Sequence, residues 1–140
     1  MTDKKKNIKF ILALFLSFIS NCILSQKISL SDLSSQKEYE NIFNQTLFQD
    51  SADVSSFLIH IKKEVKTHKH LDHVEHVLVL EGEGKMILDK EEFVVRPGDL
   101  IFIPKNIFHS VKTTSTIPLK VVSFQAPFFD GKDRVLKSDY

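Results

Sequence analysis

Four histidines lie within nine residues of this chain, at His68, His70, His73 and His76, and Glu75 lies between the last two. Imidazole and carboxylate groups together are the ligand set of borderline divalent metals. His68 and His70 are two residues apart, so their side chains point to the same face if the segment is a strand. The segment therefore predicts part of a metal-binding site.

The rest of such a site must come from a turn and from a later strand. Residues 71–74 can form a short turn, after which Glu75 precedes the apolar run HVLVL. If the strands on either side of the turn are antiparallel, Glu75 returns to the face of the His-x-His pair. A fourth ligand must come from elsewhere in the sequence, and His109 begins another apolar segment just after a turn that contains proline.

Short runs rich in Val, Ile, Leu and Phe follow one another from about residue 54. They cover residues 56–61, 76–80, 85–88, 92–95, 100–103, 108–111 and 119–124. Turn residues separate these runs, at Gly82 and Gly84, Asp89-Lys90, Pro97-Gly98-Asp99 and Pro104-Lys105-Asn106. Short strands at this spacing, with no long helical pattern between them, predict an all-β sandwich or barrel.

The histidines and turns resemble the two sequence motifs of the cupin superfamily. The first motif is a His-x-His pair, three or four residues, a Glu, six residues and a Gly, and it matches His68, His70, Glu75 and Gly82. The second is a Gly, five residues, Pro-x-Gly, two residues and a His, and it matches Gly98, Pro104, Asn106 in place of Gly, and His109. The resemblance covers about residues 55–125 and is to small single-domain bacterial cupins of the cupin type-2 kind.

The resemblance implies a double-stranded β-helix, or jelly roll, with one metal ion inside the barrel. The ligands that it implies are His68, His70, Glu75 and His109. The sequence departs from the family pattern at three positions, none of them a ligand: Lys62 and Asn106 replace glycines that the family often has, and Thr113 replaces an asparagine. Asn106 is a mild replacement, because Asn adopts a positive φ more readily than most residues.

An apolar pocket around the metal would suit a small organic ligand. The candidates to line it, chosen by strand parity or by their place near the ligands, are Val77, Val79, Phe108, Val111 and, at the mouth of the barrel, His73. His76 alternates out of phase with Glu75, so we expect it to face away from the pocket. His60 lies on an early strand, where we expect a structural role.

Three imidazoles and one carboxylate leave two positions open on a six-coordinate ion, which favours Fe, Mn or Ni, with Zn as a further option. We expect a metal-dependent enzyme, either a dioxygenase or an isomerase, that acts on a small oxygenated molecule. The alternative is a non-catalytic lipoprotein that captures a small ligand or a metal. An enzyme needs a proton-transfer group in the pocket, and only His73 and Glu83 are candidates.

The N-terminus predicts export. Four lysines within residues 1–9 precede the apolar run 10–19, as in a secretory signal, and that run is shorter than the roughly 20 residues of a transmembrane helix. Cys22 follows the run as in a bacterial lipobox, with Asn21 in place of the usual Gly or Ala. Lipidation of Cys22, ordinary cleavage after Ser25 and an uncleaved anchor are the three alternatives. We expect either a membrane-anchored lipoprotein or a periplasmic protein.

The predicted organisation is a leader (1–25), a linker (26–50) in which residues 35–43 could form a short helix, a cupin β-barrel (51–128) and a polar C-terminal tail (129–140). Without the leader, 15 basic and 17 acidic residues remain, and no Arg-rich stripe is present. This balance argues against nucleic-acid binding. The single cysteine excludes an internal disulfide, and a homodimer is left open.

Overall fold

The computed structural model describes residues 27–34, 38–49 and 53–139. The chain divides into two units, residues 1–32 and residues 33–140. The described part of the first unit ends in a single 3-10 turn, η1 (Leu30–Asp32). The predicted leader and Cys22 lie outside the described residues. Among the residues that are described, no helix is long and apolar enough to cross a membrane.

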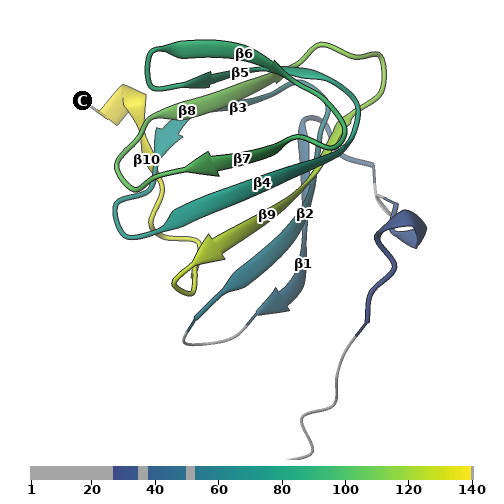
Figure 1. Ribbon diagram of the computed structural model, residues 1–140, viewed down its shortest axis with the longest axis horizontal. Helices are drawn as coiled ribbons and strands as arrows, with labels where there is room; N and C mark the ends of the chain where they lie inside the picture. Colours follow the sequence, from purple (N-terminus) through teal and green to yellow (C-terminus); the bar gives the residue numbers. More distant parts are fainter. Residues whose placement is uncertain (1–26, 35–37, 50–52, 140) are drawn as a thin grey trace, which may run out of the picture. The chain divides into compact units, whose positions relative to one another are not determined.

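The second unit is built from two antiparallel five-stranded sheets that face each other (Figure 1). One sheet has the order β1-β2-β9-β4-β7 and the other has the order β10-β3-β8-β5-β6. The strands are β1 (Ile42–Gln49), β2 (Ser55–Ile61), β3 (Glu64–Lys69), β4 (Val74–Glu81), β5 (Gly84–Leu88), β6 (Glu91–Val95), β7 (Leu100–Ile103), β8 (His109–Thr113), β9 (Leu119–Ala126) and β10 (Val135–Leu136). The predicted all-β jelly roll is confirmed.

Alternation along the strands separates the interior of the barrel from its surface. On β4, Glu75 and Val79 are buried while His76 between them is exposed, and on β7 Ile101 is buried while Phe102 is exposed. The core lies between the sheets and is mainly aliphatic; its buried members are Ile61, Val79, Met86, Val95, Ile101, Ile103, Leu119 and Val121. Burying each such side chain stabilises the fold by roughly 1.5–3 kcal/mol. The apolar positions of each strand therefore determine which of its faces points inward.

Two turns show why their residue types are needed. Gly82 has a φ of +78°, and a Cβ there would lie 2.7 Å from the carbonyl oxygen of Pro118, so both its backbone angle and its surroundings require glycine. Asn106 has a φ of 65° in the turn before β8. This confirms that asparagine can replace the glycine of the family pattern without disturbing the turn.

The ends of the barrel differ from the sequence-based description. The helix expected over residues 35–43 is not formed by the described residues 38–43; instead Ile42–Gln49 form strand β1, in which Phe43 pairs with His60 of β2. Pairing with an existing sheet outweighs a weak local helix signal. Residues 129–140, predicted as a polar C-terminal tail, contain β10, where Leu136 pairs with His68 of β3.

Candidate metal centre

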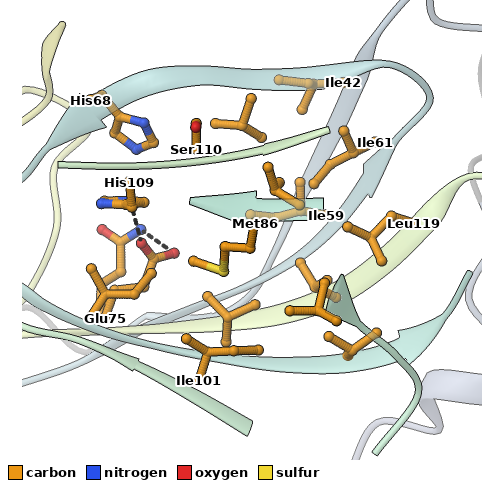
Figure 2. Close-up of a pocket in the computed structure, with 18 of the residues that line it drawn as sticks. Ile42, Ile59, Ile61, His68, Glu75, Met86, Ile101, His109, Ser110 and Leu119 are labelled. Carbon is orange, nitrogen blue, oxygen red and sulfur yellow. Dashed lines mark hydrogen bonds and ion pairs between the residues drawn. The ribbon is translucent and has the colours of Figure 1, made fainter. Parts of the chain in front are cut away.

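The four candidate ligands come from three strands in two facing sheets. His68 is on β3 and pairs directly with His109 at the start of β8, while His70 follows the end of β3. Glu75 is on β4 in the opposite sheet, and all four side chains are buried. Figure 2 shows His68, His109 and Glu75 at one end of the cavity between the sheets. The fold therefore brings together residues that are up to 41 positions apart.

The distances between these groups suit ligands of one ion. One ring nitrogen from each of His68, His70 and His109 lies within 4.8 Å of the others. Oε2 of Glu75 lies 3.4 Å from Nε2 of His109 and 3.6 Å from Nε2 of His70. Two ligands at about 2.1 Å from a common ion are separated by roughly 3.0–4.2 Å, depending on the angle between them. Three buried histidines could thus hold a metal ion, with the carboxylate against two of them.

Backbone carbonyl groups fix the orientation of all three rings. In each ring Nδ1 faces a backbone carbonyl oxygen. Nδ1 of His68 lies 2.8 Å from the carbonyl oxygen of Lys66, and Nδ1 of His109 lies 3.1 Å from that of Ile107. Nδ1 of His70 faces the carbonyl oxygen of Asp133. Since a carbonyl oxygen only accepts, each Nδ1 donates and the opposite Nε2 is left to bind something else. Nε2 of His70 and of His109 is buried without a hydrogen-bond partner among the described residues. A metal ion satisfies such atoms, so the donor set fits one.

The electrostatics of the cluster keep two of the donors in the form that binds metal. Burial, with the nearby charges of His109 and Arg134, lowers the pKa of His68 to about 3, so its ring is neutral. Burial alone would raise the pKa of Glu75, but contacts with His109, His70 and Ser123 outweigh it and lower that pKa. His70 is the exception: burial lowers its pKa, but Glu75 and the carbonyl of Asp133 raise it above 6.5 overall.

Two residues that the sequence analysis did not single out hold Glu75 in place. Ser123 Oγ donates to Glu75 Oε1 at 2.5 Å, and Gln125 Nε2 lies 3.5 Å from the same oxygen. Both are on β9, which pairs with β4 so that Gln125 faces Glu75. The signal was present in the run LKVVSFQA, where Ser123 and Gln125 share parity with the buried Val121. Polar residues at inward positions of a strand need partners inside the barrel.

Asp133 connects the C-terminal segment (residues 127–139) to the turn between His70 and Glu75. Its carboxylate accepts hydrogen bonds from the backbone amides of Leu71 and Asp72, both at 2.8 Å, and contacts His73 Nδ1 at 2.5 Å. Its carbonyl oxygen accepts from His70 Nδ1. A single residue near the C-terminus therefore orders the turn and orients one candidate ligand. The turn is also held by Asn106, whose amide donates to the carbonyl oxygen of His70 at 2.7 Å.

The placement of His73 differs from the expectation that it lines the pocket. It is buried, but it is not among the described residues that line the cavity. Its Nε2 lies 2.7 Å from the carbonyl oxygen of Phe128, and its Nδ1 contacts Asp133. Both partners are hydrogen-bond acceptors, so the ring lies between two acceptors. Its contacts bind the turn to the C-terminal segment.

A cavity of about 150 Å³ extends from the histidine cluster between the two sheets. Polar groups occupy one end and aliphatic side chains, among them Ile59, Met86 and Leu119, line the other (Figure 2). Of the predicted lining residues, Val77, Val79 and Val111 line this cavity.

Phe108 is not among the described residues that line the cavity. Its ring instead lies 5.0 Å from Lys69 Nζ, because adjacent residues on an extended chain point to opposite faces and its neighbour His109 points inward.

The remaining histidines lie away from the cluster. His76 is exposed on β4 and its ring centroid lies 4.9 Å from that of Phe102, so it faces away from the cavity as its parity predicts. His60 is buried on β2, and its ring meets that of Phe43 edge-on at 5.9 Å. Glu83, the other proton-transfer candidate, is paired with Arg96 at 2.9 Å and does not line the cavity.

Comparison with known proteins points to the same fold and family. The family model for the cupin domain matches residues 57–124. An uncharacterized protein of Aquifex aeolicus is 35% identical over 86 residues, which cover 61% of this chain and 70% of that protein.

Two solved structures share the fold at low identity. KdgF from Halomonas sp. is 17% identical with a TM-score of 0.66, covering 76% of this chain and 96% of KdgF. Streptomyces Pac13, described as a nucleoside dehydratase, is 17% identical with a TM-score of 0.63, covering 80% of this chain and 90% of Pac13. With the jelly roll and the motifs of both halves of the barrel in place, the chain belongs to the cupin family.

Proposed function

We propose that this cupin holds one divalent transition-metal ion on His68, His70, Glu75 and His109 and binds a small oxygenated molecule beside it. The observation that carries the proposal is the orientation of the rings. Each Nδ1 is held by a backbone carbonyl group, and the buried Nε2 atoms of His70 and His109 have no hydrogen-bond partner among the described residues. Without a metal, those atoms face only Oε2 of Glu75, at 3.6 and 3.4 Å.

The donor set favours Fe, Mn or Ni over structural zinc, because three imidazoles and one carboxylate leave positions open on a six-coordinate ion. When bound, the ion would supply Lewis acidity or a redox centre at the polar end of the cavity. The protein's own part is to fix the ligands and exclude water. Ser123 and Gln125 orient Glu75, and aliphatic side chains line the rest of the cavity.

Two functions are compatible with this site. The first is an enzyme of the dioxygenase or isomerase type, and similar folds in enzymes such as the nucleoside dehydratase Pac13 support it only by analogy. The second is a non-catalytic module that captures a small ligand or a metal. One observation favours the second: both sequence-based candidates for proton transfer, His73 and Glu83, are bound to other groups outside the cavity.

The metal is tested by elemental analysis of the full chain purified natively and anaerobically, and after loading with Fe, Mn, Ni or Zn. We expect about one ion per chain, with large losses of affinity in His68→Ala, His70→Ala and His109→Ala. His76→Ala is the matched control, since His76 is nearest in sequence to Glu75 but faces outward. Metal-free wild-type protein after every loading attempt would exclude the proposal. Loss of metal in His76→Ala but not in His109→Ala would indicate a scavenging His-rich segment instead.

Catalysis is tested separately from metal binding. The loaded protein is screened with small oxygenated molecules for O₂ consumption and for isomerised products. Turnover that disappears in His109→Ala supports the enzyme. Binding of a molecule in the screen without any turnover supports the capture module.

We also propose that the protein is exported as a lipoprotein through Cys22. The support is the sequence alone: lysines, a short apolar run that ends at residue 19, and Cys22 three positions later. Globomycin should leave an unprocessed precursor, and Cys22→Ala should abolish labelling with a radioactive fatty acid. A mature N-terminus at Gln26 would instead show ordinary cleavage after Ser25.

A further inference from the structure

One cavity-lining residue plays no part in the site described so far. Arg134 lies just before β10 and lines the same cavity as His68, His70 and Glu75. Among the described residues that line this cavity, Arg134 carries the only guanidinium group and Glu75 carries the only carboxylate. The side chain is exposed to solvent and still reaches the cavity, so it lies where a ligand would enter.

The register of β10 explains why Arg134 points toward the metal centre. β10 pairs with β3 in antiparallel fashion, with Leu136 opposite His68 and Val135 opposite Lys69. The same register continued by one residue places Arg134 opposite His70. Directly opposed residues in an antiparallel pair share a face, with Cβ atoms about 4.5–5.5 Å apart. Because His70 points inward, Arg134 points inward with it.

The guanidinium has no protein partner in the part of the chain that the structure describes. No hydrogen bond or ion pair of the Arg134 side chain occurs there, whereas the exposed Arg96 pairs with Glu83 at 2.9 Å. Glu75 does not serve as a partner, since Ser123 holds one of its oxygens and the other faces His70 and His109. Desolvation of the part of the side chain that reaches the cavity lowers the pKa of Arg134, and the charge of Glu75 opposes that shift.

We propose that the cavity binds a small monocarboxylic acid, with the carboxylate on Arg134 beside the metal and an apolar body against the aliphatic lining. The inference deepens the proposed function and rests on it. With a divalent ion present, one carboxylate faces an ion of charge +2 and a guanidinium, so the cavity carries excess positive charge and favours an anion. The planar guanidinium matches a carboxylate, with which it forms two parallel hydrogen bonds.

The volume limits the size of the acid. A dry cavity of about 150 Å³ admits a molecule as large as benzene, and the cavity here has a similar volume of about 150 Å³. Its far end is lined by Ile59, Met86 and Leu119, which offer no hydrogen bonds to a polar body (Figure 2). The acid therefore has a hydrocarbon body of roughly four to six carbon atoms.

The test uses pairs of probes that differ only in charge: benzoate with benzamide, and 3-methylbutanoate with 3-methylbutanamide. Calorimetry measures their binding to the full chain loaded with Mn or Ni, and metal content is measured on the same samples. We expect at least one acid to bind 10- to 100-fold more tightly than its amide. Arg134→Gln should remove this preference while metal content stays near one ion per chain.

Two further variants make the result specific. Lys132→Gln removes a nearby positive charge that is exposed and paired with Asp130, and it should bind the probes as wild type does. Arg134→Lys keeps the charge but not the planar fork, so it should bind acids less tightly than wild type and still prefer them to amides. It also serves if Arg134→Gln does not fold.

Equal binding of acids and amides, binding of none of the probes, or an unchanged preference in Arg134→Gln would overturn this proposal while leaving the metal site intact. Wild-type protein that takes up no metal would instead refute the proposed function. In that case, binding of acids and amides is compared in the metal-free protein. If the metal-free protein does not prefer acids, the role of Arg134 is refuted as well.

Discussion

Replacing Asp133 with alanine should destabilise the metal-free protein by about 3 kcal/mol. The Asp133 carboxylate contacts three hydrogen-bond donors, and its side chain is only 10% exposed. Leu71 and Asp72 are exposed, so water can replace the carboxylate at their amides and the loss there is about 1 kcal/mol in total. His73 is buried and its Nδ1 loses its hydrogen-bond partner, which adds about 2 kcal/mol.

Urea unfolding of metal-free protein, followed by circular dichroism, measures this difference. For a domain of this size, 3 kcal/mol corresponds to a melting temperature lower by roughly 12 °C. The matched control is Asp130→Ala, because Asp130 is exposed and bonds only to Lys132 among the described residues. That change should alter stability by less than about 0.5 kcal/mol.

The effect of Asp133 should also depend on pH in a defined direction. Burial alone would raise the pKa of Asp133, but His73 and the amides of Asp72 and Leu71 lower it from 3.8 to about 2. A carboxyl group with a depressed pKa stabilises the folded state fully above about pH 4, and the stabilisation is lost as the pH falls toward 2. Wild type and Asp133→Ala should therefore converge in stability over that range. Equal stabilities of Asp133→Ala and Asp130→Ala at pH 7 would show that the contacts do not order the turn.

Three further outcomes are expected. Because Glu75 raises the pKa of His70, the metal-free protein should lose stability as the pH rises above 6.5. The increase in melting temperature on adding metal should instead grow over the same pH range, because metal binds the neutral ring. Calorimetric scans with and without metal measure both trends. Ser123→Ala should weaken metal binding about 10- to 100-fold in a competition titration against a chelator, because Glu75 loses its donor. Gly82→Ala should destabilise more than Gly131→Ala in urea unfolding: both have positive φ, but only at Gly82 would a Cβ meet backbone atoms.

The sequence was sufficient for the features that depend on local periodicity. His68 and His70 share a face because they are two residues apart on a strand, and His76 faces outward because it is one residue from Glu75. Such parity holds wherever a strand has one buried face. The structure brings the four predicted ligands together, and their role in binding metal stays a prediction.

The same reasoning failed where structure depends on contacts that are distant in the sequence. Residues 42–49 form a strand because they pair with β2. No local sequence pattern within residues 42–49 predicts that pairing. His73 was assigned to the pocket because it lies among the ligands. Its two hydrogen bonds go to Phe128 and Asp133, 55 and 60 residues away, and these decide its orientation.

The proposed binding of an acid depends on a part of the chain that periodicity describes least well. β10 is only two residues long, too short for any alternating pattern, and it lies in a segment that is polar overall. Nevertheless β10 pairs with β3, and the two residues just before it reach the site: Arg134 lines the same cavity as His70, and Asp133 binds the turn after His70. In the proposed site, the motif supplies the metal ligands, while Arg134 in the C-terminal segment supplies the positive charge that the acid would meet.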